Sequence, residues 1–360
     1  MLRAGLIGFP NAGKTTLFEL LTSVHDSGRS QGKLDANVGV ARVPDVRLDQ
    51  LTALFNPKKK VPATVEFADM AAGARTGTSA LVDVVAYRSA HALLHVVHAF
   101  RDASVPHPSA TIDPARDVRA IEDELILADL GIVERRLDRL EKDLRKSNTP
   151  ELRREQEALG RCRTALEAGR PLRVIGLDRE DAKLLTGFQF LSAKPLLIVL
   201  NLDEADIARA ETAVADAGLS RLVAEAGAGV VPVCARIELE IAQLDAADAA
   251  VFMADLGLTA SGLDRVIRAA YELLGYISFF TVGEDECRAW SIPRGTSAQQ
   301  AATEIHSDIA RGFIRAEVVP CAQLLARGSL AACREHAELR LEGKEYVVLD
   351  GDTITFRHAT

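Results

Sequence analysis

The sequence predicts an α/β protein whose mostly parallel sheet carries an inserted helical hairpin and is followed by a small α+β module. Three observations predict this organisation. Near-continuous apolar runs alternate with helical stretches, which is typical of a parallel sheet covered by helices on both faces. Between the third and fourth of these runs, the apolar residues follow the spacing of a long helix. From about Tyr276 onward, short strand-like segments are separated by turn residues.

The composition is that of a globular protein with a sizeable core. Its 360 residues are 48% hydrophobic and 26% charged, which favours two or three domains. No run approaches about 18 uncharged apolar residues and the start lacks a signal-like apolar stretch, so we expect neither a membrane protein nor an exported one. The five cysteines show no Cys-x-x-Cys spacing, which favours a reducing, cytoplasmic environment. The net charge of −8 argues only weakly against a nucleic-acid partner, because most of it lies in one segment. Residues 171–275 hold nine basic and sixteen acidic side chains.

Four apolar runs are expected to form the parallel sheet. They are Leu2 to Ile7, Thr64 to Ala68, Ala92 to Val97 and Pro195 to Leu200. A glycine-punctuated turn and an apolar helix around Leu17 and Leu20 follow the first run. The chain therefore begins with a strand, a loop and a helix.

A long helical hairpin is expected between the third and fourth strands. Apolar residues recur at alternating steps of three and four through positions 118, 121, 125, 128 and 132, and the spacing resumes at Val133. We expect a helix over about 116–146, a break at Ser147 to Pro150, and a second helix through Leu166. Two helices lying on the sheet are the alternative, but about 30 residues of helix would overhang an ordinary domain. The pattern favours a projecting antiparallel hairpin.

The C-terminal module is expected to contain two hairpins and one helix. Predicted strands cover 277–281 and 287–292, a helix covers 298–310, and strands 346–349 and 353–356 flank an Asp-Gly-Asp turn. The composition changes near Gly275. The predicted domains are 1–115 with 171–275, the hairpin 116–170, and the C-terminal domain 276–360.

The segment from Gly8 to Thr15, GFPNAGKT, satisfies the phosphate-loop pattern in full and lies between a strand and a helix, as that pattern requires. The alternative interpretation is a tight glycine turn with no ligand. In a phosphate loop, backbone N–H groups and the helix N-terminus surround phosphate oxygens. Lys14 would reach the β- and γ-phosphates, and the Thr15 hydroxyl would bind Mg²⁺. The residues expected to bind phosphates are Asn11, Ala12, Gly13, Lys14, Thr15 and Thr16.

Three later segments complete the predicted site. Asp69 ends the second strand, where phosphate-loop proteins keep a carboxylate for Mg²⁺. Asn-Leu-Asp-Glu at 201–204 stands where guanine-specific proteins carry Asn-Lys-x-Asp. Because Glu204 replaces the aspartate that accepts guanine N–H groups, we expect weaker guanine recognition. The residues expected around the base are Asn201, Leu202, Glu204, Cys234 and Ala235.

With these residues in place, the chain resembles the YchF-type Obg-like ATPases over nearly its whole length. The resemblance is carried by NVGV at 37–40, VPD at 43–45, RLD at 47–49, PATVEF at 62–67, ELILAD at 124–129 and, in the last module, RAW at 288–290, IHSD at 305–308, GFIRAE at 312–317 and DGD at 350–352. It implies a Ras-like P-loop NTPase domain with the helical hairpin and a C-terminal TGS domain, which has a ubiquitin-like β-grasp fold. It also implies a cytoplasmic, Mg²⁺-dependent enzyme that hydrolyses ATP in preference to GTP and associates with the ribosome or its large subunit. We expect a monomer.

The resemblance also names a catalytic residue. In this family, the candidate catalytic residue is a histidine in a loop. The matching residue here is His107, which would act together with Lys14. Without the resemblance, a loop histidine between prolines is most often a bystander.

Both predicted switch segments depart from the family pattern. Thr-Ile-Glu-Pro-Asn is replaced by a segment that begins at Lys33, and the glycine after Asp-Ile-Ala is replaced by Ala72 or displaced to Gly73. The pattern therefore predicts nucleotide binding and leaves turnover open. A non-hydrolysing, nucleotide-bound ribosome- or RNA-binding module and a GTP-specific switch stay open as alternatives.

The hairpin tip is a candidate RNA contact. Residues 135–163 hold ten Lys/Arg against six Asp/Glu, and Arg153 and Arg154 are the first candidates for phosphate contacts. A solvated, salt-bridged helix face is the alternative.

Overall fold

The computed structural model describes residues 3–23, 37–69 and 84–359, which form two compact units. The first unit comprises Met1–Ala41 and Glu66–Leu273, and the second comprises Arg42–Val65 and Leu274–Thr360. None of the described helices is long and apolar enough to cross a membrane.

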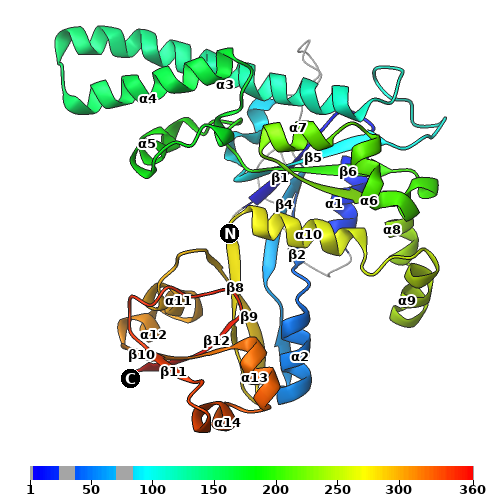
Figure 1. The fold of residues 1–360 in the computed structure, drawn as a ribbon, viewed down its shortest axis with the longest axis vertical. Helices are drawn as coiled ribbons and strands as arrows, with labels where there is room; N and C mark the ends of the chain where they lie inside the picture. Colours follow the sequence, from blue (N-terminus) through cyan, green and yellow to red (C-terminus); the bar gives the residue numbers. More distant parts are fainter. Residues whose placement is uncertain (1–2, 24–36, 70–83, 360) are drawn as a thin grey trace. The chain divides into compact units, whose positions relative to one another are not determined.

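The first unit is built on a six-stranded sheet (Figure 1). Its strands, in the order β2-β4-β1-β5-β6-β7, are β1 (Arg3–Ile7), β2 (Asn37–Arg42), β4 (Thr64–Asp69), β5 (Ala92–Ala99), β6 (Leu196–Leu202) and β7 (Gly229–Val233). The pairs β1–β4, β1–β5, β5–β6 and β6–β7 are all parallel. Every residue of β6 is buried, because helices cover both faces of the sheet. The predicted parallel α/β domain is confirmed.

The helices of this unit include those that cover the two faces of the sheet and those that extend beyond it. They are α1 (Lys14–Ser23), η2 (Val84–Ser89), α3 (Pro114–Lys146), α4 (Pro150–Glu167), η3 (Leu172–Val174), α5 (Arg179–Leu185), η4 (Thr186–Phe188), η5 (Glu204–Arg209), α6 (Ala210–Asp216), α7 (Ser220–Ala226), α8 (Ala235–Ile241), α9 (Ala246–Asp255) and α10 (Gly262–Leu273).

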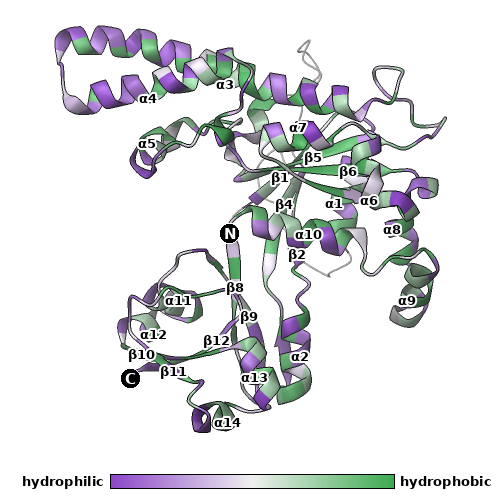
Figure 2. Ribbon diagram, viewed as in Figure 1, coloured by the Kyte–Doolittle hydropathy of each residue, from purple (hydrophilic) through white to green (hydrophobic). Residues whose placement is uncertain are grey.

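The long helix α3 belongs to two packing environments. Its first turns bury Val118, Ile121 and Leu125 against the sheet, whereas Val133 and Leu140 pack against α4. Figure 1 shows the second half of α3 running beyond the sheet with α4 alongside. Figure 2 shows that most residues of this half are hydrophilic. The α3–α4 hairpin therefore has the form that the apolar spacing predicts, and both its helices begin with a capping side chain, Asp113 and Thr149.

The base of the hairpin is fixed by Asp129, whose side chain is fully buried. Its carboxylate accepts hydrogen bonds from the N–H groups of Leu191 and Ser192, at 3.0 and 2.7 Å, and from the Ser192 hydroxyl at 2.9 Å. Arg88 also pairs with it. These bonds tie α3 to the segment that leads into β6.

The second unit contains another six-stranded sheet, in the order β11-β10-β12-β8-β9-β3. Its strands are β3 (Lys59–Val61), β8 (Tyr276–Thr281), β9 (Glu286–Pro293), β10 (Phe313–Pro320), β11 (Arg340–Glu342) and β12 (Asp352–His358), and its helices are α2 (Val46–Phe55), α11 (Ala298–Ile305), α12 (Ser307–Arg311), α13 (Cys321–Arg327) and α14 (Leu330–Glu335). A C-terminal sheet domain is therefore present. Its assignment as a TGS domain stays a prediction.

Two predicted elements of this unit are wrong. Residues 346–349 form no strand with 353–356; Val347 makes a single bridge to Ser297, and β12 pairs with β10 and β8 instead. The predicted helix 298–310 is broken at His306, whose extended backbone and side chain cap the start of α12.

The grouping of residues 42–65 also differs from the sequence-based division. The sequence pattern assigns this segment to the nucleotide-binding domain, but in the structure α2 and β3 belong to the second unit, where β3 pairs in parallel with β9. Lys59 and Lys60 lie in this strand. The sequence of a short segment does not indicate which sheet the segment joins. The sequence pattern therefore could not show that residues 42–65 belong to the second unit.

Candidate nucleotide-binding site

The phosphate loop connects β1 to α1, and two of its glycines have backbone positions that a side chain could not share. Gly8 has φ +152°, and a Cβ there would lie 2.3 Å from the Val96 carbonyl oxygen. Gly13 has φ +95°, and a Cβ there would lie 2.6 Å from Nδ2 of Asn201. At both positions, neighbouring atoms lie where a Cβ would stand. The absence of a side chain therefore lets the chain form a tight loop at the N-terminus of α1, the positive end of the helix.

Lys14 lies over this loop. Its Nζ donates hydrogen bonds to the carbonyl oxygens of Gly8 and Phe9, at 2.9 and 2.7 Å. Burial lowers the pKa of Lys14, and the negative charge of Asp69 partly offsets that effect. The ammonium group is thus held where phosphate oxygens would replace the two carbonyls.

Thr15 and Asp69 come together although 54 positions separate them. The Thr15 hydroxyl donates to Oδ2 of Asp69 at 3.1 Å, and Asp69 is 1% exposed. A hydroxyl and a carboxylate are hard oxygen ligands of the kind that Mg²⁺ prefers, and both lie beside the lysine that would bind phosphate. These residues fit a magnesium site. No cluster of three or more His, Cys, Asp or Glu side chains that could hold another metal ion occurs among the described residues.

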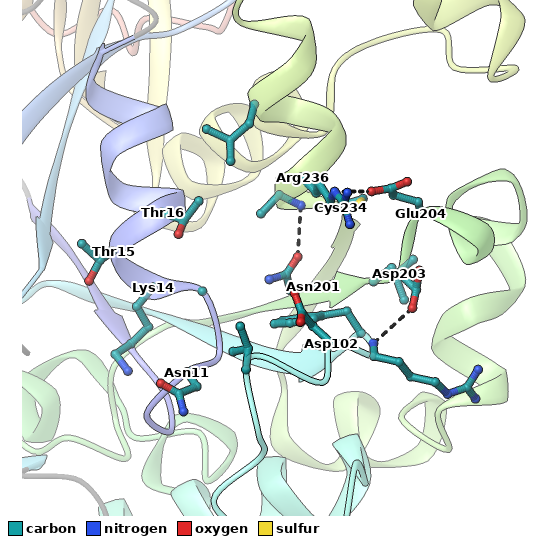
Figure 3. A pocket seen from close by; sticks show the side chains of 17 residues that line it. Asn11, Lys14, Thr15, Thr16, Asp102, Asn201, Asp203, Glu204, Cys234 and Arg236 are labelled. Carbon is teal, nitrogen blue, oxygen red and sulfur yellow. Dashed lines mark hydrogen bonds and ion pairs between the residues drawn. The ribbon is translucent and has the colours of Figure 1, made fainter.

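A cavity of about 430 Å³ opens next to the phosphate loop (Figure 3). All the predicted nucleotide-binding residues line it except Ala12, which is buried beneath it. Asn11 has φ +65° and lines the cavity with its side chain. Residues that the sequence analysis missed also line it: Phe100, Arg101, Asp102, Val105, Asp203, Arg236 and Leu239.

Most of these missed residues share one feature, their place at the ends of neighbouring strands. Residues 100–113 form the loop between β5 and α3, which we call the histidine loop. The N–H of Arg101 donates to Oδ2 of Asp203 at 3.1 Å, which joins this loop to the end of β6. The carboxyl ends of parallel strands lie at the same edge of a sheet. The residues that follow β5 and β6 therefore line one cavity, but this requires the strand order, which the sequence pattern does not give.

Asn201 connects the phosphate loop with the loop after β7. Its Nδ2 donates to the carbonyl oxygen of Ala12 at 3.1 Å, and its Oδ1 accepts from the N–H of Ala235 at 3.1 Å. Asn201 is 5% exposed, so these two bonds satisfy an amide in a buried environment.

At the far end of the cavity, Glu204 is paired with Arg236. The Arg236 Nε lies 2.6 Å from Oε1 of Glu204, as Figure 3 shows. A guanine base would need the Glu204 carboxylate as a hydrogen-bond acceptor, and one of its two oxygens already accepts from Arg236.

His107 does not lie in the cavity. Its Nε2 donates to Oδ2 of Asp117 at 2.7 Å, and its Nδ1 accepts from the N–H of Ser109 at 3.0 Å. The predicted catalytic role of His107 stays a prediction, and in this conformation Asp117 of α3 holds the buried ring outside the cavity. The predicted switch residues Lys33 and 70–77 lie outside the described residues.

A parallel sheet with a phosphate loop at the end of β1, a Thr–Asp pair beside it and a base cavity at the ends of β6 and β7 defines the class of P-loop NTPases. Two family models match the chain: "50S ribosome-binding GTPase" over residues 3–128, and the YchF-GTPase C-terminal model, described as "Protein of unknown function (DUF933)", over residues 276–359. The chain belongs to the YchF family.

Full-length similarity to several relatives supports this assignment. The "Ribosome-binding ATPase YchF" of Bacillus subtilis is 42% identical, with 99% of each chain covered. The relative of the same name from Haemophilus influenzae is 38% identical over 99% of this chain and 98% of its own. The solved structure of the Schizosaccharomyces pombe YchF GTPase superposes with a TM-score of 0.88 at 30% identity, covering 99% of this chain and 97% of the other.

Proposed function

We propose that this protein is a Mg²⁺-dependent ATPase that associates with the ribosome. The observation that carries the first part is the convergence of Lys14, Thr15 and Asp69 at the phosphate loop, beside a cavity large enough for a nucleotide. The bound ion would neutralise phosphate charge during transfer to water. Lys14 would supply a positive charge to the same phosphates.

The base end of the cavity supports a preference for ATP over GTP. A guanine base donates its N1–H and its 2-amino hydrogens to a carboxylate, and adenine has neither group. Since Arg236 occupies Glu204, a guanine base would compete with an ion pair for this carboxylate. Competition of labelled ATP by unlabelled GTP tests this preference, and displacement by GTP at much lower concentration would favour a GTP-specific switch.

Phosphate release with and without ribosomes tests the enzyme. We expect Lys14→Ala to lower kcat by about 100-fold or more, because one charge that stabilises the transferring phosphoryl group is lost. Lys183→Ala, which removes an exposed lysine of α5, is the matched control and should leave kcat unchanged. Equal release by the natural protein and Lys14→Ala under all these conditions would contradict hydrolysis at this site.

A nucleotide-binding module without turnover is the second candidate. The observation that favours it is the burial of His107 against Asp117. In that case nucleotide would bind in a Lys14-dependent manner, but no phosphate would be released.

Ribosome association is proposed from the names of the relatives and is supported by a charged face of α3. Four cationic residues, Arg135, Arg139, Lys142 and Lys146, are exposed and make no ion pair among the described residues. Their spacing of four, three and four places them within roughly 60° of one another on the helix, opposite the buried Val133 and Leu140. We call these four residues the α3 cationic stripe, and we propose that it contacts ribosomal RNA phosphates. This function implies a cytoplasmic protein.

Arg153 and Arg154, our first candidates for that contact, are less suitable. Arg154 donates from Nε to Oδ1 of Asp181 at 2.8 Å, and it also pairs with Asp178 and Glu180. Arg153 donates to the Asn148 side chain. A guanidinium that three carboxylates already surround offers little net charge to a phosphate.

A further inference from the structure

Besides the bond from Arg101 to Asp203, two neighbouring residues of the histidine loop bond to other parts of the first unit. Nδ2 of Asn11, in the phosphate loop, donates to the carbonyl oxygen of Pro106 at 3.1 Å. The next residue, His107, is 8% exposed and bound to Asp117. Val105 lines the nucleotide cavity, whereas His107 two positions later does not. The chain therefore turns the histidine away from the cavity that Val105 lines.

The hydrogen bonds of His107 leave no free ring nitrogen. Since an N–H can only donate, the bond from Ser109 assigns a lone pair to Nδ1. The proton then lies on Nε2 and is donated to Asp117. A neutral imidazole in this state has no remaining acceptor for a water proton and no donor for a phosphate oxygen.

Asp117 is itself held in place from its other side. Its Oδ1 accepts from Nε and NH2 of Arg116, at 2.9 and 2.8 Å. Arg116 also donates to the hydroxyl and the carbonyl oxygen of Thr111, both at 2.8 Å. The carboxylate that binds His107 is thus clamped by an arginine that also binds the end of the histidine loop.

The packing around His107 contains one uncompensated polar atom. The Phe9 ring meets His107 edge-on with centroids 6.3 Å apart, and the His98 ring lies 5.2 Å away. Nε2 of His98 donates to the Phe100 carbonyl oxygen, and its Nδ1 is buried with no hydrogen-bond partner among the described residues. An acceptor that is buried without a hydrogen bond raises the free energy of the conformation in which His107 is withdrawn. The free-energy difference between this conformation and one in which the histidine loop has moved is therefore smaller.

We propose that Asp117 is a positioning residue that keeps His107 withdrawn from the nucleotide cavity, so that turnover requires His107 to leave Asp117. This inference rests on the proposed ATP hydrolysis and on the catalytic role that the resemblance to the YchF-type ATPases implies for His107. A surface that moves the start of α3 or the histidine loop, such as the ribosome, would then raise the rate by releasing the ring.

Steady-state ATP hydrolysis by the full chain tests the proposal. We expect Asp117→Ala to raise kcat about tenfold without ribosomes and to leave the KM for ATP unchanged, because the withdrawn state loses a charge-assisted hydrogen bond. Asp117→Asn, which keeps an acceptor of the same size, should give an intermediate rate. The double variant with His107→Ala should fall to the rate of His107→Ala alone. A kcat for Asp117→Ala that is unchanged, or that falls to the His107→Ala level, would overturn the proposal.

A second measurement does not depend on activity. Amide hydrogen exchange over residues 100–113, including the Ser109 N–H that binds His107, should be faster in Asp117→Ala and Asp117→Asn. Arg119→Ala is the matched control, since it removes an exposed side chain from the same turn of α3 that makes no ion pair among the described residues. Unchanged exchange in both Asp117 variants, or an equal increase in the control, would contradict the positioning role.

These readouts separate two kinds of failure. If Lys14→Ala and the natural protein release phosphate equally, the proposed function fails, and hydrogen exchange still decides whether Asp117 holds the loop. If release depends on Lys14 but not on Asp117, only the positioning role fails.

Discussion

The amide of Asn201 holds two segments of the site at once. One bond goes to the phosphate loop and the other to the loop after β7, and both measure 3.1 Å. Gly13 leaves room for this amide, because a Cβ there would contact Nδ2. The side chain therefore shapes the cavity before any base enters it.

We predict that Asn201→Ala weakens nucleotide binding by roughly ten- to a hundredfold, because two buried hydrogen bonds are lost and their partners are left unsatisfied. Asn201→Asp is the matched variant: it keeps the acceptor toward Ala235 but places a carboxylate oxygen against the Ala12 carbonyl oxygen, so its affinity should be no higher than that of Asn201→Ala. Titration with a fluorescent nucleotide measures both. An alanine variant that binds as tightly as the natural protein would show that the two loops stay in place without the amide.

At this scale, the sequence predicted residues that are adjacent in the chain better than those that only the fold brings together. The phosphate loop is one continuous motif, so Lys14 and Thr15 could be placed before the structure was known. Arg101 and Val105 belong to no motif, and only the position of β5 beside β6 brings them to the cavity. The partner of His107 could not be predicted, because a hydrogen bond between a loop and a helix start leaves no pattern.

The helix α3 has a buried face and, opposite it, a charged outer face. Its buried face forms the hairpin core with α4, and its outer face carries the α3 cationic stripe, which spans about 16 Å along the helix. Neighbouring arginines on other faces are paired, as Arg136 is with Glu155 and Arg145 with Glu141. Over residues 135–146, the cationic side chains that make no ion pair among the described residues therefore lie along one line.

We predict that replacing all four residues of the α3 cationic stripe with glutamine weakens ribosome binding and lowers the slope of log affinity against log salt by about 3 to 4. The reason is that each phosphate contact releases a counterion. Co-sedimentation with ribosomes at several salt concentrations measures the slope. Arg145→Gln with Arg163→Gln is the control, since both residues have i,i+4 partners. If the control changes the slope as much per residue, general charge and not the stripe governs binding.

Elements with a long local signal were predicted and those decided by distant pairing were not. The apolar repeat of α3 extends over many turns and gave its end at Lys146. In contrast, the Asp-Gly-Asp turn does stand at Gly351, with φ +87°, but the strand before it is absent. Because β12 finds partners in β8 and β10, the turn chemistry alone indicated the wrong neighbour.

Over the whole molecule, the chain passes between the two units three times, near residues 41, 65 and 273. The segment 42–65 therefore contributes to the core of the second unit. Leu48 and Leu51 of α2 are buried, and Cys287 of β9 lies 4.0 Å from the Leu51 carbonyl oxygen through its Sγ. Arg47 ties α2 to the end of the chain through Asp350 at 2.8 Å.

This arrangement predicts that the C-terminal segment 276–360 is incomplete by itself. Without α2 and β3, the thiol of Cys287, which is fully buried in the whole chain, should become exposed. Reaction with a thiol reagent, followed by peptide mapping, should therefore label Cys287 much faster in the fragment than in the full chain. Cys333 of α14 is the internal control, because its contacts include the Gln323 carbonyl within the fragment. Equal labelling of Cys287 in the fragment and the full chain, with the secondary structure of the fragment intact, would contradict a core shared with residues 42–65.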